Sequence, residues 1–338
     1  MALSGGVDSS VAASILKAEG HDVEALCIKM SPLHNTTVAA AEKAAARFSM
    51  PIHILDGEEL FKDIVISDFV NEYKNGRTPN PCIICNRSVK FHLLYDYAVK
   101  NGFDKIATGH YAKIKNVDGK NYIAVAENLK KDQSYMLYRL PSHIIDSLIF
   151  PLGSIETKED VRAVAKSDDL PSANAPDSQE ICFIENEGYA DYIERNFGPS
   201  LGGRFIGPNG EDLGKHKGIM NYTIGQRKGL GIAYSEPIYV KEIDHKSGNI
   251  SLCRSGEEFF SGVKLKGVFL PHPIGEKSFS AKVKIRYAAK PETAEISLTE
   301  DGGVVLFNKS LRACCPGQSV VFYKDDVVLG GGFIDENI

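Results

Sequence analysis

The order of apolar and helix-forming runs in the first 110 residues limits the fold of this sequence more than any other feature. Strand-like apolar runs alternate there with amphipathic runs that have helical spacing. The strand-like runs cover residues 23–30, 52–55 and 105–108, and the helical runs cover residues 9–19, 37–48, 61–73 and 86–100. Strands and helices that alternate in this way form a parallel sheet covered on both faces. We therefore predict an α/β fold for the N-terminal part of the chain.

The sequence changes in character from about residue 200. Glycines recur, and short runs rich in Val, Ile and Phe are separated by turn signals such as Asp301-Gly302 and Asp325-Asp326. These runs cover residues 263–270, 279–287, 304–308, 319–323 and 327–329. Short strands at this spacing are typical of a small β-barrel. Between the two parts, we expect a mixed segment with helices at 157–166 and 189–196.

Two absences in the sequence suggest where the protein works. No run reaches the roughly 18 apolar residues of a membrane-spanning helix. The first residues, MALSGGVDSS, lack the basic and apolar regions of a secretory signal. We therefore expect a cytoplasmic protein that does not contact membranes. In a reducing compartment, seven cysteines, an odd number, indicate catalytic, metal-binding or packed thiols rather than a disulfide framework.

The net charge of −5 hides an uneven distribution of charge along the chain. Residues 264–290 carry seven basic side chains against one acidic, and residues 204–228 carry five against two. Clustered positive charge indicates a partner with a phosphate backbone. A solvated strand face is the alternative interpretation of the same charges.

Residues 4–10, with the sequence Ser-Gly-Gly-Val-Asp-Ser-Ser, lie between a short strand and a predicted helix. At such a junction, backbone N–H groups and the helix dipole converge on an anion. The loop lacks the lysine of a Walker A motif. Asp8 would repel a phosphate unless it served a bridging Mg²⁺. The loop resembles the PP-loop of the ATP pyrophosphatase superfamily, and a flexible Gly/Ser turn is the alternative.

Three cysteines carry the second chemical signal. Cys82 and Cys85 precede the helix predicted from Asn86, and a cysteine near a helix N-terminus has a lowered thiol pKa. Cys182 follows a polar run that can expose it. A sulfur nucleophile can displace an adenylated oxygen, and a second thiol can resolve a persulfide. Cys82-x-x-Cys85 could instead be half of a metal site, although no second such pair occurs. The other cysteines, Cys27, Cys253, Cys314 and Cys315, are predicted to pack in the interior.

Several sequence blocks point together to one family. The blocks NPxxxCN, ATGHYA, KDQSYxLY, PDSQEICF, YTIGQRKGLG and PGQ occur in order along nearly the whole chain. They resemble those of the bacterial tRNA-specific 2-thiouridylases. The resemblance implies an enzyme that uses ATP to adenylate the C2 oxygen of the wobble uridine of tRNA. Sulfur then replaces that oxygen, with release of AMP and pyrophosphate. Cys85 could attack either the persulfide or the activated base.

The resemblance also implies domains and site residues. The expected domains are a PP-loop ATP-binding domain (1–188), a central tRNA-binding domain (189–262) and a C-terminal β-barrel (263–338), with residues 150–171 able to pack with the central domain. Cys85 would be the nucleophile and Cys182 the persulfide carrier. The implied ATP-binding residues are Ala2, Leu3, Ser4, Gly5, Gly6, Val7, Asp8, Ser9, Met30 and Gly109, with Mg²⁺ on Asp8. The implied contacts to the target base and tRNA are Asn80, Pro81, Cys82, His110, Lys131, Asp132, Gln133, Arg286, Tyr287 and Gln318. His110 also follows the end of a predicted strand, where ligands bind in open α/β sheets.

The expected partners are tRNA and a cysteine desulfurase or sulfur-relay protein, and we expect a monomer. The sequence departs from the family pattern at Cys82, where many members have Asp, and in its short first strand. Exposure of the neighbouring strands is the expected cost of that short strand. Two alternatives remain: an amide-forming PP-loop synthetase, and an RNA-binding protein without catalytic activity.

Overall fold

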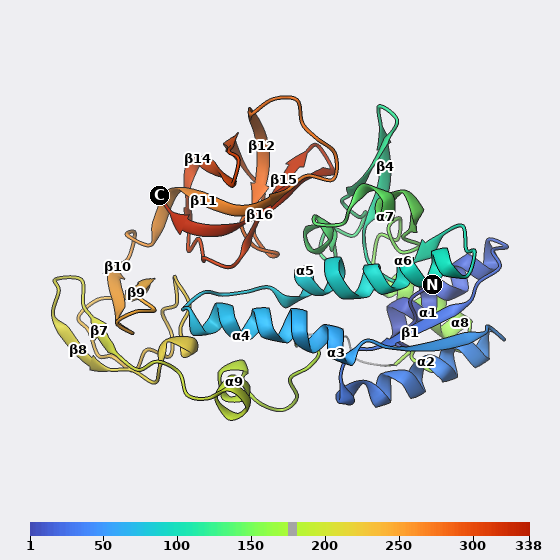
Figure 1. The fold of residues 1–338 in the computed structure, drawn as a ribbon, viewed down its shortest axis with the longest axis horizontal. Helices are drawn as coiled ribbons and strands as arrows, with labels where there is room; N and C mark the ends of the chain where they lie inside the picture. The colour runs from blue at the N-terminus through green and yellow to red at the C-terminus, as the bar shows by residue number, and fades with distance from the viewer. Residues whose placement is uncertain (175–180) are drawn as a thin grey trace.

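The N-terminal domain contains the predicted parallel sheet (Figure 1). The computed structural model describes residues 1–174 and 181–338, so the first part of the PDSQEICF block lies outside the described residues. Strand β1 (Ala25–Lys29) pairs in parallel with β2 (Ile52–Asp56), and β3 (Ile106–Ala107) pairs in parallel with β6 (Leu148–Ile149). Residues 1–3 join the two pairs, because the Ala2 N–H donates to the Ala107 carbonyl (2.8 Å) and the Leu3 N–H donates to the Leu26 carbonyl (3.0 Å).

The helices around this sheet follow the predicted runs closely. Helix α1 spans Val7–Ala18, α2 spans Asn35–Arg47, and α3 (Glu58–Phe61), the π-turn η2 (Lys62–Ile66) and α4 (Ser67–Lys74) form one long run. A second long run consists of α5 (Pro81–Cys85), the π-turn η3 (Asn86–Lys90) and α6 (Phe91–Lys100). Within the described residues, no helix is both long and apolar enough to cross a membrane.

The second run begins earlier than its sequence predicts. We expected a helix from Asn86, but it starts at Pro81. Asn80 is its N-cap: the side-chain oxygen accepts a hydrogen bond from the Cys82 N–H at 3.2 Å, and proline suits the first helical position. Cys82 and Cys85 therefore lie inside a helix, not in a loop before it.

Helices α7 (Ser142–Ser147) and α8 (Lys158–Ser167) complete the N-terminal domain. Thr157 and Asp160 form a capping box that satisfies free N–H groups at the start of α8. Val161 and Ala165 of α8 pack in one cluster with Val11 of α1. Helix α8, within the segment 150–171, thus packs on the N-terminal domain.

The central part of the chain contains α9 (Tyr189–Phe197) and a small sheet. Its strands are β7 (Arg204–Ile206), β8 (Asp212–Lys215), β9 (Ile238–Ile243) and β10 (Ile250–Arg254). Phe205, Tyr222, Val240 and Leu252 form its buried core.

The C-terminal part is a closed β-barrel, as predicted. Its strands are β11 (Phe259–Phe269), β12 (Ser278–Lys284), β13 (Glu292–Leu298), β14 (Gly302–Arg312), β15 (Ser319–Lys324) and β16 (Val327–Asn337). They pair in the order β11-β14-β13-β12-β15-β16, and β16 closes the barrel on β11. The sequence prediction missed β13, because only Ala294 and Ile296 of this strand point into the core.

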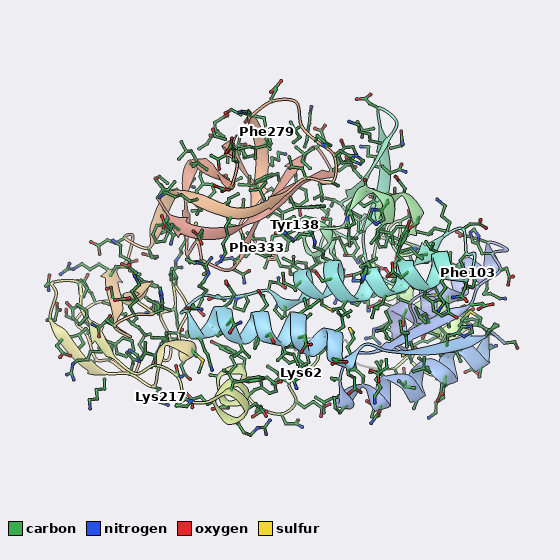
Figure 2. All side chains as sticks on the ribbon, viewed as in Figure 1. Lys62, Phe103, Tyr138, Lys217, Phe279 and Phe333 are labelled. Atoms are coloured by element: carbon green, nitrogen blue, oxygen red, sulfur yellow. The ribbon has the colours of Figure 1, made fainter. Side chains whose placement is uncertain are left out.

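The barrel is attached to the N-terminal domain at several points. The hairpin of β4 (Lys113–Val117) and β5 (Lys120–Ala124), which the sequence did not predict, extends the barrel sheet by pairing Ala124 with Val327. At the other side of the contact, the Tyr135 hydroxyl donates to the Ser319 carbonyl at 2.9 Å, and the Tyr138 hydroxyl lies 3.0 Å from the Ser319 Oγ. Figure 2 shows Tyr138 and Phe333 at this junction.

Ion pairs reduce the free charge of the basic segments. Lys264 pairs with Glu336 at 2.8 Å, Lys266 lies 3.5 Å from Glu72, and Arg204 pairs with Asp212. The count of basic and acidic residues in these two segments therefore overstates the positive charge that they offer to a partner. The side chains of Lys277, Lys282, Arg286 and Lys290 remain exposed on the barrel.

Replacement of Tyr135 by Phe should loosen the contact between barrel and N-terminal domain. Both Tyr135 and Ser319 are fully buried, so the loss of one buried hydrogen bond should cost about 1–3 kcal/mol. The expected result is a lower melting temperature by circular dichroism. Tyr95→Phe is the matched control, since the described residues form no hydrogen bond with the Tyr95 hydroxyl. Equal melting temperatures for the two variants would contradict this assignment.

Candidate active site

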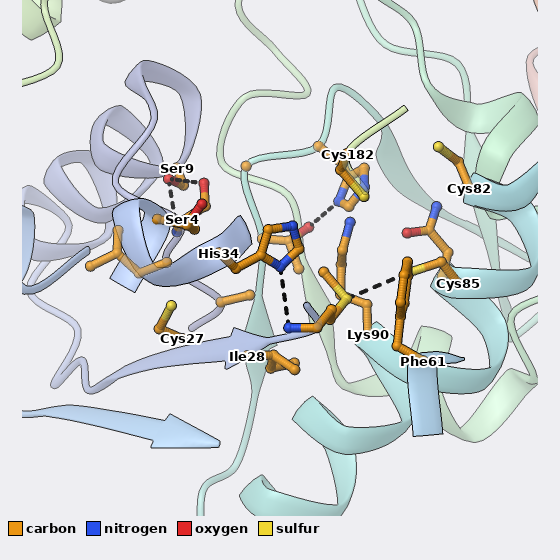
Figure 3. A pocket seen from close by; sticks show the side chains of 18 of the residues that line it. Ser4, Ser9, Cys27, Ile28, His34, Phe61, Cys82, Cys85, Lys90 and Cys182 are labelled. Atoms are coloured by element: carbon orange, nitrogen blue, oxygen red, sulfur yellow. Dashed lines mark hydrogen bonds between the residues drawn. The ribbon is translucent and has the colours of Figure 1, made fainter. Parts of the chain in front are cut away.

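A cavity of about 410 Å³ opens at the carboxyl ends of β1, β3 and residues 1–3 (Figure 3). The glycine-rich loop forms one wall with Ser4, Asp8 and Ser9. Cys85 and Cys182 lie on the opposite side. The cavity thus brings together the anion-binding loop and the two thiols that were singled out from distant parts of the sequence.

The loop wall is shaped for an anion. Gly5 has a φ of +73°, and a Cβ on it would lie 2.3 Å from the Ala40 carbonyl carbon, so no other residue fits there. Gly6 is the N-cap of α1 and makes no side-chain cap, which leaves the first N–H groups of the helix to a ligand. The hydroxyls of Ser4 and Ser9 lie 3.1 Å apart beside them.

Gly109 lies directly against this loop. A Cβ at position 109 would be 2.8 Å from the Ser9 nitrogen and 2.9 Å from the Asp8 carbonyl carbon. The segment after β3 can therefore approach the loop backbone only with glycine at this position. This close contact explains why position 109 is occupied by glycine.

Asp8 is the single carboxylate among the described residues that line the cavity. Its Oδ1 accepts hydrogen bonds from the Tyr111 hydroxyl and from the Lys158 ammonium, each at 2.6 Å. The described residues contain no group of three side chains arranged to hold a metal ion. Mg²⁺ is commonly held by one or two carboxylates together with substrate phosphates. The donor set therefore fits Mg²⁺ carried by a phosphate ligand, and does not fit a site made of protein groups alone.

The environment of Cys85 differs from the sequence prediction. Burial raises the pKa of the Cys85 thiol, whereas the sequence predicted a lowered pKa. Cys85 is only 7% exposed and lies beyond the first helical turn, where the dipole effect has faded, so desolvation outweighs it. Its Sγ lies 3.6 Å from the Met30 Sδ.

Cys182 lies at the rim of the cavity and is exposed. Desolvation by the surrounding protein nevertheless raises the pKa of its thiol to about 12, and the neighbouring Cys85 and Cys82 act in the same direction. His34 holds this segment in place. The His34 Nδ1 accepts a hydrogen bond from the Met30 N–H at 3.2 Å, and its ring also hydrogen-bonds to the Cys182 backbone.

The residues expected to contact the target base and tRNA fall into two groups. Four of them line the cavity: Pro81, Cys82, His110 and Gln133. Cys82 is exposed, and burial lowers the pKa of His110 well below its usual value. The Gln133 Oε1 accepts a hydrogen bond from the Tyr111 N–H at 2.9 Å. Asn80 caps the helix that carries Pro81 and Cys82.

The second group lies where the barrel meets the N-terminal domain. Asp132 is buried, and its carboxylate accepts hydrogen bonds from the N–H groups of Ala126 and Ser134 and from the Ser134 hydroxyl. The Gln318 Nε2 donates to the carbonyls of Thr78 (2.9 Å) and Pro79 (3.3 Å). In this structure, Asp132 and Gln318 thus organise the chain. Arg286 is exposed, whereas Lys131 and Tyr287 are half-buried.

Among the lining residues that the sequence prediction missed are the two basic side chains of His34 and Lys90. His34 could have been found by the rule that identified His110, because it closely follows the end of a strand. Lys90 gave no such signal. It lies five residues after Cys85, a spacing that places two residues on different faces of an α-helix.

The parallel sheet, the glycine-rich loop and the helix that follows it define a PP-loop protein of the HUP-domain class. The family described as tRNA methyl transferase HUP domain matches residues 1–186. The tRNA methyl transferase PRC-barrel domain matches residues 190–254, and the aminomethyltransferase beta-barrel domain matches residues 266–334.

Curated relatives match the chain from end to end. The tRNA-specific 2-thiouridylase MnmA of Pelobacter propionicus is 44% identical, over 99% of this chain and 96% of the relative. The proteins of the same name from Trichlorobacter lovleyi and Clostridioides difficile are 41% and 39% identical, each over 99% of this chain and 96% and 97% of the relative. The chain belongs to the family of tRNA-specific 2-thiouridylases.

The raised pKa of Cys182 predicts an unusual reactivity profile. Because the thiol stays protonated up to a pKa of about 12, its alkylation by iodoacetamide should become about tenfold faster per pH unit from pH 7 to pH 10. In the urea-unfolded chain, the rate should level off near pH 9, since an ordinary thiol has a pKa of about 8.5. Peptide mass spectrometry gives both profiles. A plateau below pH 10 in the folded protein would show that desolvation does not control this thiol.

Proposed function

We propose that this chain is an ATP-dependent tRNA 2-thiouridylase that uses Cys85 and Cys182 for sulfur transfer. One observation carries the proposal: both thiols line the same cavity as the anion-binding loop. A site for sulfur transfer to an adenylated base needs this combination. The family relation supports the choice of tRNA, because the relatives are named as tRNA-specific 2-thiouridylases.

The loop wall would bind ATP. The free N–H groups at the start of α1 and the Ser4 and Ser9 hydroxyls suit its phosphates. Met30 and Gly109 lie beside this wall and suit contacts with the nucleotide. Bound through the phosphates and Asp8, Mg²⁺ would supply charge neutralisation. The uridine C2 oxygen attacks the α-phosphorus of ATP, and pyrophosphate leaves.

The target base would enter beside Cys82 and His110, between the loop wall and the thiols. A wobble uridine in an anticodon loop is single-stranded, so its extrusion into a cavity costs little. The exposed basic side chains of the barrel suit the tRNA backbone. His110 is neutral at pH 7, because burial lowers its pKa, and so can offer a hydrogen bond to the base without adding charge.

The two thiols would have different tasks because their exposure differs. Cys182 is exposed, so a cysteine desulfurase or relay protein can load it with a persulfide. Cys85 is buried and acts from within. The Cys85 thiolate attacks the inner sulfur of the Cys182 persulfide, the S–S bond breaks, and a disulfide and HS⁻ result. HS⁻ then displaces AMP from C2, and an external dithiol restores the two thiols.

Both thiols are free in the structure. A disulfide requires Cα atoms about 4.4–6.8 Å apart. We therefore expect the Cα atoms of Cys85 and Cys182 to lie at this separation when the disulfide forms.

The two alternatives explain less of the site. An amide-forming PP-loop synthetase would use the loop wall and leave both thiols without a role. An RNA-binding protein without catalytic activity would not need the two thiols in the cavity. The thiols in the cavity therefore favour sulfur transfer over both.

Replacement of either thiol by serine tests the mechanism. Cys85→Ser and Cys182→Ser should each abolish 2-thiouridine formation with ATP and a persulfide donor, as measured by mass spectrometry of tRNA nucleosides. Cys253→Ser is the control, because Cys253 is buried in β10 of the central domain. Normal thiolation by both variants would refute the mechanism. Rescue of Cys182→Ser alone by free sulfide would support the roles given to the two thiols.

Gly109→Ala tests the nucleotide site separately. The added Cβ would lie 2.8 Å from the Ser9 nitrogen, so the loop must move and the affinity for ATP should fall at least tenfold. Gly275→Ala is the control, because a Cβ there meets nothing within 4 Å. Isothermal titration calorimetry with ATP measures both. Unchanged affinity in Gly109→Ala would place the nucleotide elsewhere.

A further inference from the structure

Lys90 differs from the other described residues of the cavity in its charge. It is the only cationic side chain among the described residues that line it. Lys90 forms no ion pair or side-chain hydrogen bond with any residue in 1–174 or 181–338, although it is half-buried. Figure 3 shows it between Cys85 and Cys182. A half-buried ammonium with no partner among the described residues suggests a role toward a negative charge that forms during the reaction.

The π-turn η3 brings Lys90 to this place. In a regular α-helix, a residue five positions after Cys85 would point about 140° away from it. In η3, the Phe91 N–H bonds to the Asn86 carbonyl, five residues back, which adds one residue to the turn. The direction of Lys90 then differs from that of Cys85 by only about 40°. A local distortion of the helix thus places the ammonium on the same face as the buried thiol.

We propose that Lys90 is the positioning charge that stabilises the Cys85 thiolate for sulfur transfer. The proposal rests on the proposed function for its biological meaning, but its physical content concerns only these two residues. Cys85 loses its Sγ proton to water in the cavity, and the ammonium balances the thiolate that remains. The thiolate is then ready to attack the Cys182 persulfide.

The other described groups that face Cys85 carry no positive charge that could stabilise its thiolate. The helix itself contributes Cys82, the opposite segment contributes Cys182, and the sheet edge contributes His34 and His110. Burial lowers the pKa of both imidazoles, and Lys90 lowers it further, so both rings are neutral at pH 7. The other two groups are thiols, which bring no positive charge.

Burial and the Lys90 charge have opposite effects on the pKa of the Cys85 thiol. Burial raises the pKa of its thiol, while the Lys90 ammonium and a hydrogen bond from the Lys90 backbone N–H act in the opposite direction. Without the Lys90 ammonium, only the hydrogen bond from the backbone N–H would oppose the effects of burial and of the neighbouring Cys82 thiol. The nucleophile would then be protonated over a wider range of pH.

Alkylation of Cys85 across pH tests the proposal without tRNA or ATP. In Lys90→Met, the rate of iodoacetamide modification at pH 8 should fall about tenfold, and its midpoint should move to higher pH. Lys90→Arg, which keeps the charge, should stay near the wild-type profile. Lys100→Met is the control, because Lys100 is exposed at the end of the same helical run. Tandem mass spectrometry separates Cys85 from Cys82.

The outcomes are distinct. An unchanged midpoint in Lys90→Met, with circular dichroism as in the wild type, would overturn the proposal. An unchanged midpoint with a raised KM for ATP would assign Lys90 to the phosphates and also overturn it. If Lys90→Met does not fold, Lys90→Gln provides the same comparison. Failure of the wild-type protein to form 2-thiouridine would refute the proposed function, whereas the alkylation profile would still decide the role of Lys90.

Discussion

The pairing of residues 1–3 with two strands at once is the constraint on which the site depends. Their backbone groups bond to β1 on one side and to β3 on the other, and the glycine-rich loop follows immediately. The position of the loop is therefore set by backbone hydrogen bonds. Gly109 follows β3 and lies against the loop backbone, so the same sheet positions both the loop and Gly109 at the edge of the cavity.

A second constraint connects the barrel to the thiols. Gln318 bonds to the carbonyls of Thr78 and Pro79, and the Thr78 N–H donates to the Pro316 carbonyl at 2.8 Å. These bonds fix the segment that leads directly into the helix of Cys82 and Cys85. The barrel thus supports the cysteine helix at its first turn, whereas the sheet supports the loop wall opposite. Figure 1 shows this helical run between the sheet and the barrel.

The sequence predicted what depends on local patterns. Strand and helix periodicity was sufficient for the parallel sheet and the barrel, and the motif Ser4–Ser10 was sufficient to place a glycine-rich loop between the first strand and α1. The pKa of Cys85 was predicted in the wrong direction, because burial depends on segments that come from elsewhere in the chain. Strand β13 was missed because few of its side chains are apolar. Lys90 was missed because the expected helix was regular.

The π-turn η3 also has a consequence for the register of the helix. Ile83 and Phe91, both fully buried in one apolar cluster, are eight residues apart and would differ by about 80° in a regular α-helix. One additional residue in the turn reduces this difference to about 20°, so the two side chains align. Leu94 and Ala98 continue the same buried face. Deletion of a single residue between Cys85 and Phe91 would leave Ile83 and Phe91 seven residues apart, a spacing that a regular α-helix aligns to within about 20°. A regular helix could therefore replace the π-turn in such a variant and keep the same buried face.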